Sequence, residues 1–383
     1  MNKTIAILGA TGSVGRQSLE VAKNKGYRVD FLSAGRDVDG METAARLFSP
    51  VAVAMADAHA AAELKLRLAD TGIRVYSGER GILEGIAASR ADTVINAILG
   101  SAGLAPTLSV IREGKALALA NKESLVVAGN IVMEEAKKKS LQVIPVDSEH
   151  SAIFQSLKSG ESSEIRRIIL TASGGPFFGK TREQLRCVTL HDTLNHPTWK
   201  MGKKISTDSA TLMNKGFEII EASHLFGVDE SQIEVIIHRE SILHSAVEYI
   251  DNVQIGQLSV PDMRTCIQYA LEYPKRTESL AAPLDLTRIG ALTFYQPDTE
   301  AFPLLSLARR AVRDGGAYPA VLNALDEIAV GAFLEGKISF FEISELIFDA
   351  YESFLGLGSV NSLDGILEYD RLARIKLSER IAK

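Results

Sequence analysis

The stretch DSEH at residues 147–150 has the side chains best suited to chemistry, and it follows the apolar run LQVIPV. Two carboxylates one residue apart at a turn can converge on a hard divalent cation, which takes oxygen ligands. The same residues also suit a helix N-terminus, where an Asp or Ser cap contributes about 0.5–2 kcal/mol and an acid in the first turn is favourable. This stretch alone supports helix capping and metal binding equally.

A second group of polar residues lies in SATLMNKGFEIIEA, which has helical periodicity. Asn214 and Glu218 share one face, with Lys215 near its edge. Lys215 and Glu218 could be a solvated pair worth only tenths of a kcal/mol. Gly216 argues against this, because a glycine inside a helix costs about 1 kcal/mol relative to Ala and suggests a close approach to the helix. Ser, Asn and Lys side chains suit a phosphate, and Glu218 would be a third metal carboxylate.

The N-terminal IAILGATGSVG places Gly9, Gly12 and Gly15 between an apolar strand and a helix. Glycines there permit a tight turn and a close approach of the backbone to a pyrophosphate held at the helix start. The alternative is a glycine-rich turn without a ligand, because the spacing is G-x-x-G-x-x-G and not the commoner G-x-G-x-x-G. Arg36, after the second strand, favours NADP over NAD, although Asp37 directly after it weakens that preference.

Other polar clusters follow apolar strands, at NKES (residues 121–124) and at SGG (residues 173–175). The SGG stretch could form a backbone nest for an anion. Ligands of open α/β sheets collect beyond the carboxyl ends of the strands, so these clusters are expected to face one crevice. HPTWKMG, residues 196–202, is expected to be a mobile loop carrying the only tryptophan, with packing of that ring on the core as the alternative.

The elements that position these residues indicate an α/β protein. Strands alternate with amphipathic helices over residues 1–150, which predicts a Rossmann-like parallel sheet. Residues 151–273 are expected to form a central α+β catalytic domain with partly antiparallel strands and a lid loop near 195–202. Residues 274–302 are expected to be a linker. Helical periodicity over residues 303–383 predicts a C-terminal helical bundle.

The composition excludes several classes of protein. A formal charge of −6 argues against a general nucleic-acid binder. Cys187 and Cys266 can supply neither a disulfide framework nor a four-thiolate zinc site, and we expect both to be structural thiols in a reducing compartment. No apolar run reaches the length of a membrane span, and the N-terminus does not resemble a signal peptide. A cytoplasmic protein without membrane or nucleic-acid partners is expected.

Taken together, these motifs closely resemble the 1-deoxy-D-xylulose 5-phosphate reductoisomerase family from end to end. PVDSEH and DSATLMNKGFE are the most specific stretches, supported by ILGATGSVG, LANKESLV, SGGPF, IHRESILHS and PDMRTCI. The glycine loop alone would not be specific. The chain departs from the family pattern in having Arg36-Asp37 where Lys-Asn is common, and Ala172 where Gly occurs.

The resemblance implies a role for each site residue, and a homodimer that acts on a small phosphorylated sugar. It implies that Mg²⁺ or Mn²⁺, with Co²⁺ as a further candidate, is held by Asp147, Glu149 and Glu218. The implied substrate ligands are Ser173, Ser209, Asn214 and Lys215 for the phosphate, Lys122 and Ser148 for the carbinol end, and His196 and Trp199 in the lid. The residues implied in catalysis are Lys122, Asp147, Glu149, Glu218 and His196. NADPH would be held by Thr11, Gly12, Ser13, Val14, Gly35, Arg36, Asp37, Asn121, Glu123 and Gly202.

The implied activity is the rearrangement and NADPH-dependent reduction of 1-deoxy-D-xylulose 5-phosphate to 2-C-methyl-D-erythritol 4-phosphate, in isoprenoid precursor biosynthesis by the methylerythritol phosphate pathway. Three alternatives compete with it. A simple NADP-linked dehydrogenase of a small aldehyde would leave the three acids without a role. A semialdehyde dehydrogenase would need a nucleophilic cysteine, which neither cysteine resembles. A non-catalytic NADP-sensing module would bind the dinucleotide without metal-dependent turnover.

Overall fold

The computed structural model of the chain describes residues 3–199, 201–356 and 360–382, which fall into two units. The first unit combines the chain up to Ser124 with Asn130–Ser151 and Asp262–Ala282. The second combines Leu125–Gly129, Ala152–Pro261 and the chain from Pro283 onward. The segment Asp262–Ala282 was expected to divide between the central domain and the linker, so the division into units differs there from the predicted domains.

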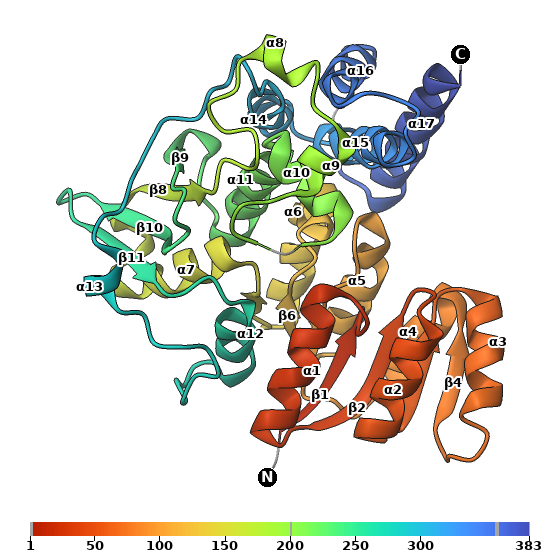
Figure 1. Ribbon diagram of the computed structural model, residues 1–383. Helices are drawn as coiled ribbons and strands as arrows, with labels where there is room; N and C mark the ends of the chain where they lie inside the picture. Colours follow the sequence, from red (N-terminus) through yellow and green to blue (C-terminus); the bar gives the residue numbers. More distant parts are fainter. Residues whose placement is uncertain (1–2, 200, 357–359, 383) are drawn as a thin grey trace. The chain divides into compact units, whose positions relative to one another are not determined.

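The first unit contains a seven-stranded sheet in the order β4-β3-β2-β1-β5-β6-β7, in which every neighbouring pair is parallel (Figure 1). The chain therefore builds outward from β1 to β4 and returns to β5 on the other side of β1. This reversal is the point at which open α/β sheets bind ligands. The strands are β1 Thr4–Leu8, β2 Arg28–Ala34, β3 Ala52–Met55, β4 Arg74–Ser77, β5 Thr93–Asn96, β6 Ala116–Leu119 and β7 Val143–Pro145.

Helices connect the strands of this sheet, as expected for a parallel sheet, and the strands other than the edge strand β4 are largely buried. They are α1 Ser13–Lys25, α2 Val38–Phe48, α3 Ala58–Arg67, α4 Gly78–Ala88, the 3₁₀ turn η1 Ser101–Gly103, α5 Leu104–Arg112 and α6 Glu123–Lys138. The later helix α12 (Met263–Glu272) buries Cys266, Ile267 and Leu271 and contacts α1, β6 and β7. These contacts explain why the segment carrying α12 belongs to the first unit.

The second unit contains a four-stranded mixed sheet in the order β11-β10-β8-β9. Strand β10 is antiparallel to both β11 and β8, whereas β8 and β9 are parallel, so the prediction of partly antiparallel strands is confirmed. The linker residue Tyr295 forms an antiparallel bridge with Ile237. The strands are β8 Ile165–Ala172, β9 Ile233–Ile237, β10 Leu243–Tyr249 and β11 Gln254–Leu258.

Helices make up the rest of the second unit, and the predicted C-terminal helical region is confirmed by α14 to α17. Helix α15 packs on α14, α16 and α17, and it is apolar enough to be buried along most of its length. The helices are α7 Ser148–Ser156, which begins in the first unit, α8 Arg182–Leu185, α9 Leu190–Leu194, α10 Lys203–Ala210, α11 Met213–Phe226, α13 Leu286–Ile289, α14 Leu304–Asp314, α15 Tyr318–Leu334, α16 Phe340–Glu352 and α17 Leu363–Ile381, with 3₁₀ turns η2 Leu157–Ser159, η3 Ser162–Glu164 and η4 Glu230–Gln232.

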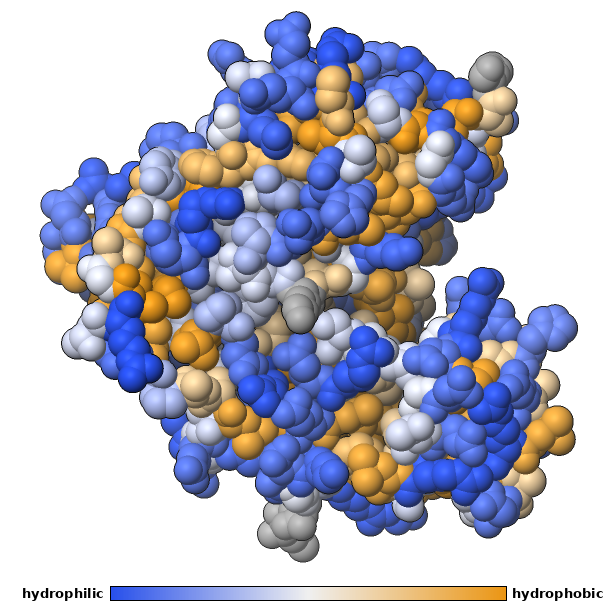
Figure 2. All heavy atoms as spheres, in the orientation of Figure 1, coloured by the Kyte–Doolittle hydropathy of each residue, from blue (hydrophilic) through white to orange (hydrophobic). Residues whose placement is uncertain are grey.

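Hydrophilic side chains cover most of the surface that Figure 2 shows, with apolar residues in patches between them. No helix among the described residues is both long and apolar enough to cross a bilayer.

Candidate active site

The glycine loop after β1 has the geometry of an anion site. Gly9 has a φ of +80°, and a Cβ on Gly15 would lie 2.1 Å from the carbonyl oxygen of Gly9. Only glycine at position 15 therefore lets α1 approach the loop this closely. Gly12 caps α1 without a side-chain hydrogen bond, so the first N–H groups of the helix stay available for an anion. The predicted cofactor residues here are accessible and lie at this helix start: Thr11, Gly12, Ser13 and Val14.

The exposed turn after β2 contains Gly35, Arg36 and Asp37. The Arg36 side chain is 87% exposed and its Nε lies 3.0 Å from Oδ2 of Asp57. Asp37 Oδ1 accepts a hydrogen bond of 2.9 Å from the N–H of Gly40 and so caps α2. Arg36 therefore carries an exposed positive charge at this strand end, whereas Asp37 has a structural role in the turn.

Asn121, after β6, is a buried scaffold residue. Its Nδ2 donates to the carbonyl oxygens of Ile98 (2.6 Å) and Gly100 (2.9 Å) and to Oε2 of Glu123 (3.0 Å). Its Oδ1 accepts from the N–H of Ser124 at 3.0 Å. The Asn121 amide thus holds the loop that follows β5, and it also donates to the carboxylate of Glu123.

Lys122 and Asp147 follow the neighbouring strands β6 and β7, and Lys122 Nζ lies 2.6 Å from Asp147 Oδ2. Asp147 Oδ1 lies 3.3 Å from Nδ1 of His150 and accepts from the N–H of Glu149 at 3.2 Å. Burial opposes the charge of Asp147, but the Lys122 ammonium and then His150 hold the pKa of this carboxyl well below its usual range. Asp147 therefore caps the start of α7 and is also a charged carboxylate. Ser148 donates to the carboxylate of Glu149.

Ser173 and His196, both in the second unit, contact each other through their side chains. His196 Nδ1 accepts from the N–H groups of Thr198 (3.2 Å) and Trp199 (3.0 Å), so the proton of the neutral ring is on Nε2. That Nε2 lies 2.9 Å from Ser173 Oγ, which also accepts from the N–H of Gly175 at 3.3 Å. With both of these bonds donated to its oxygen, the Ser173 hydroxyl can direct its own proton to a ligand.

The predicted lid, residues 195–202, is described except for residue 200. Trp199 is half-buried, and its ring centroid lies 6.3 Å from that of His244. Gly202 is exposed and caps α10, the helix that carries Ser209. The segment thus connects His196 directly to the helix of a predicted phosphate ligand.

Helix α11 carries Asn214, Lys215 and Glu218 in one hydrogen-bonded cluster. Asn214 Nδ2 and Lys215 Nζ donate to the two carboxylate oxygens of Glu218. Lys215 is 4% and Glu218 1% exposed, so the alternative of a solvated pair is wrong. A Cβ on Gly216 would lie 2.5 Å from Cβ of Ala308 on α14, which confirms the close approach that Gly216 indicates. Helix α14 therefore packs against the face of α11 that carries Gly216.

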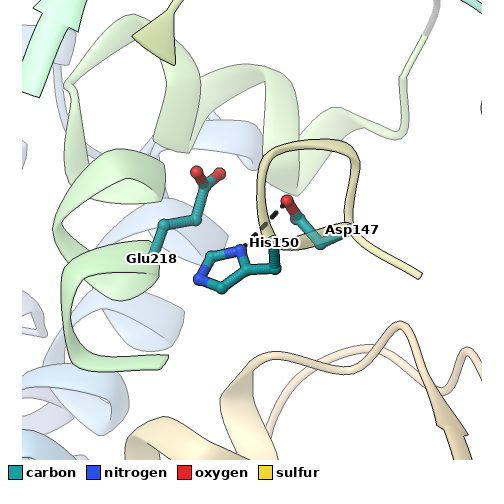
Figure 3. Close-up of side chains that lie close together, drawn as sticks. All are labelled: Asp147, His150 and Glu218. Atoms are coloured by element: carbon teal, nitrogen blue, oxygen red, sulfur yellow. Dashed lines mark hydrogen bonds and ion pairs between the residues drawn. The ribbon is translucent and has the colours of Figure 1, made fainter. Parts of the chain in front are cut away.

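Figure 3 draws three side chains of the types that ligate metal ions, Asp147 and His150 in the first unit and Glu218 in the second. The dashed line in Figure 3 marks the Asp147–His150 interaction. The predicted metal ligands have Glu149 in place of His150. The sequence could have predicted His150 as a further candidate ligand, because it lies three residues after Asp147, on the same face of a helix.

The seven-stranded parallel sheet and the glycine loop between β1 and α1 define a protein of the Rossmann-like, dinucleotide-binding class. Three family models match successive parts of the chain: 1-deoxy-D-xylulose 5-phosphate reductoisomerase at residues 5–129, its C-terminal domain at 143–226, and the DXP reductoisomerase C-terminal domain at 258–376. The chain belongs to the 1-deoxy-D-xylulose 5-phosphate reductoisomerase family.

Similar proteins cover the whole chain. The reductoisomerase of Acetivibrio thermocellus is 50% identical over 100% of both chains, and that of Thermoanaerobacter pseudethanolicus is 48% identical over 100% of this chain and 99% of its own. The reductoisomerase of Zymomonas mobilis, solved in complex with NADPH, has a TM-score of 0.92 at 40% identity and covers 100% of this chain and 99% of its own. A DOX-P reductoisomerase solved with NADPH, fosmidomycin and magnesium has a TM-score of 0.92 at 40% identity, covering 99% of this chain and 98% of its own.

Proposed function

We propose that the chain converts 1-deoxy-D-xylulose 5-phosphate to 2-C-methyl-D-erythritol 4-phosphate, using NADPH and a divalent cation. The observation that carries this proposal is the match of the family along the entire chain, at up to 50% identity among the relatives described above.

The cofactor would bind the first unit. The N–H groups at the start of α1 suit its pyrophosphate, and the exposed Arg36 suits a 2′-phosphate. Asp147, Glu149 and Glu218 supply the oxygen ligands that Mg²⁺ and Mn²⁺ prefer. When bound, the cation polarises the carbonyl and hydroxyl oxygens of the substrate, and NADPH supplies the hydride.

The second unit would bind the substrate phosphate through Ser173, Ser209, Asn214 and Lys215. Lys215 supplies a buried positive charge, and Ser173 supplies the hydroxyl proton that His196 and Gly175 leave available. Binding energy from a remote phosphate can hold a lid closed over the reacting carbons. His196 and Trp199, in the segment that precedes α10, are the residues of that lid.

Lys122 and Ser148 would contact the carbinol end of the substrate. Lys122 is 5% and Ser148 8% exposed, so both are held in a nearly dry environment where their hydrogen bonds are strong. Lys122 also keeps Asp147 ionised, which a carboxylate must be to ligate a cation. We further propose, from the family resemblance alone, that the enzyme is a cytoplasmic homodimer and that Co²⁺ can replace Mg²⁺ or Mn²⁺.

The test is NADPH oxidation by the purified protein with 1-deoxy-D-xylulose 5-phosphate, with and without Mg²⁺ or Mn²⁺, and with NADH as the control. Metal-dependent oxidation that prefers NADPH is expected. Oxidation that survives a chelator would leave a plain dehydrogenase, and binding of NADPH without oxidation in any combination would leave a sensing module.

A further inference from the structure

The Ser173–Gly175 loop adopts a backbone conformation that needs external support. Gly174 and Gly175 have φ values of +77° and +65°, two consecutive left-handed residues. Two adjacent glycines have the largest conformational freedom to lose, so a fixed loop shape here costs entropy. A Cβ on Gly175 would also lie 2.7 Å from the carbonyl oxygen of Ser209, so the loop runs against α10.

Arg239 supplies that support from a position 66 residues away in the sequence. Its Nη1 donates to the carbonyl oxygens of Ser173 (2.8 Å) and Gly175 (2.7 Å). The guanidinium carbon lies 5.1 Å from the centroid of the Phe178 ring, within the range of a cation–π interaction. One side chain therefore binds the first and last residues of the loop at once.

The direction of the hydrogen bonds from Arg239 determines which way the backbone N–H groups of the loop point. In a trans peptide the C=O and N–H point in opposite directions, so turning the Ser173 carbonyl toward Arg239 turns the N–H of Gly174 away from it. Phe177, two residues after the loop, is 1% exposed and packs edge-on against Phe340 with ring centroids 4.9 Å apart. The loop is thus anchored by Phe177 at its end and by Arg239 along its carbonyl side.

The backbone of Arg239 also lies near the predicted lid. Thr198 Oγ1 is 3.5 Å from the carbonyl oxygen of Arg239, and His196, two residues earlier, bonds to Ser173. Arg239 therefore contacts the Ser173–Gly175 loop through its side chain, and its main chain lies next to the predicted lid.

We propose that Arg239 is a positioning residue for substrate binding, holding Ser173 and the Gly174 amide in the orientation that accepts the substrate phosphate. This inference rests on the proposed function, because it assigns Arg239 to the phosphate end of that substrate. In this role Arg239 acts through the loop that it holds. The sequence motif IHRESILHS contains it, but its spacing gives no indication that residue 239 reaches residue 173.

The experiment compares Arg239→Met, Arg239→Lys and a matched control, Arg309→Met. Arg309 also donates to two backbone carbonyls of the second unit, those of Glu230 (3.2 Å) and Ile233 (2.7 Å), neither of which is in the Ser173–Gly175 loop. For each variant we would measure kcat, the KM for the sugar phosphate, the KM for NADPH, and the shift in melting temperature produced by inorganic phosphate.

Losing two charge-assisted hydrogen bonds should raise the KM for the sugar phosphate by roughly tenfold or more in Arg239→Met, with kcat and the KM for NADPH changed by less than about threefold. Arg239→Lys keeps a charged donor but lacks the planar, multi-donor guanidinium, so it should lie between wild type and Arg239→Met. Phosphate should protect Arg239→Met from unfolding less than it protects wild type. Arg309→Met should lower the melting temperature and leave the phosphate response and both KM values unchanged.

Unchanged KM and unchanged phosphate protection in Arg239→Met would overturn the positioning role while leaving the proposed function intact. Similar fold-changes in kcat and in both KM values would also overturn the positioning role. The same changes in Arg309→Met would overturn it too, because either result would indicate general destabilisation. If Arg239→Met does not fold, the same comparison applies to Arg239→Lys. Failure of the wild-type protein to turn over the sugar phosphate would instead overturn the proposed function, and phosphate protection would still report on the loop.

Discussion

Two glycine-containing loops, Gly9–Gly15 and Ser173–Gly175, are built differently, although both suit an anion. The loop from Gly9 to Gly15 lies between β1 and α1 and uses backbone N–H groups at a helix start. The loop from Ser173 to Gly175 does not begin a helix, and distant side chains hold it: Arg239 on its carbonyls and His196 on its hydroxyl. The first loop is therefore formed by residues that are adjacent in the chain, whereas the second depends on tertiary contacts.

This difference predicts that mutations at the two loops affect different ligands, NADPH at the first and the sugar phosphate at the second. Changes in the first unit that disturb the Gly9–Gly15 loop or Arg36 should weaken NADPH binding and spare the response to inorganic phosphate. Changes that disturb the Ser173–Gly175 loop or Arg239 should affect the sugar phosphate and spare NADPH. A variant whose effect crosses from one ligand to the other would contradict this prediction.

The largest effect is expected from Glu218→Gln. The substitution keeps the size of the side chain but removes the charge that Asn214 and Lys215 contact and that a cation would need. Turnover should fall by about a thousandfold or more, whereas NADPH affinity stays nearly unchanged. Steady-state kinetics and calorimetric titration with NADPH measure the two quantities. Substantial residual activity at saturating metal would remove Glu218 from the metal site.

Gly15→Ala should have the next largest effect, on NADPH alone. The new Cβ would lie 2.1 Å from the carbonyl oxygen of Gly9, so the loop and the start of α1 must move apart. We expect NADPH affinity to fall by roughly a hundredfold, as a cost of about 3 kcal/mol implies. Gly72→Ala is the matched control, since a Cβ there meets open space. Normal NADPH affinity in Gly15→Ala would show that the loop does not hold the cofactor.

Acid should weaken the second unit through His224, whose imidazole lies against Gly129. Burial lowers the pKa of His224 from 6.5 to about 4. Between those two pH values the unfolded chain binds a proton that the folded chain does not, so the free energy of unfolding falls as the pH falls through this window. The loss should reach roughly 2–3 kcal/mol.

Urea unfolding at pH 7 and pH 4.5 measures this loss, and His224→Gln should remove most of it. His59→Gln is the control, because it makes the same substitution at an exposed histidine. The same pH dependence in His224→Gln as in wild type would assign the loss to other groups.

The smallest effect is expected from Arg36→Ala, because Arg36 is exposed and its ion pair with Asp57 contributes little. Its proposed partner is the 2′-phosphate that distinguishes NADPH from NADH. The preference for NADPH, measured as the ratio of kcat/KM values, should fall by about tenfold. Arg80, also in the first unit and 92% exposed, provides the control variant Arg80→Ala. An unchanged preference in Arg36→Ala would place NADPH selection elsewhere.

The sequence predicts local features of this molecule well. The strand, glycine turn and helix at the N-terminus are adjacent in the chain, so their geometry follows from residue types alone. Gly216 correctly indicates a close approach, because the interior of a helix disfavours glycine unless a neighbouring element needs the space. Asp147 also follows a buried strand, and its capping role is the one expected at a helix start.

Features that depend on distant contacts were not predictable in the same way. The bonds from Arg239 to Ser173 and Gly175 join residues on separate elements, and no periodicity relates them. Asp262–Ala282 belongs to the first unit because α12 contacts β6 and β7, which the sequence order does not indicate. Asn121 has the residue type of a ligand, but its amide is used to hold the loop after β5.

The most direct test of the proposed reaction is the identity of the product formed with deuterium-labelled NADPH and Mg²⁺. Rearrangement followed by hydride transfer predicts 2-C-methyl-D-erythritol 4-phosphate, a branched product carrying the deuterium label, which nuclear magnetic resonance and mass spectrometry would detect, and none of it when a chelator is present. A labelled but unbranched sugar alcohol phosphate would show reduction without rearrangement, and would contradict the assignment of this chain as a reductoisomerase.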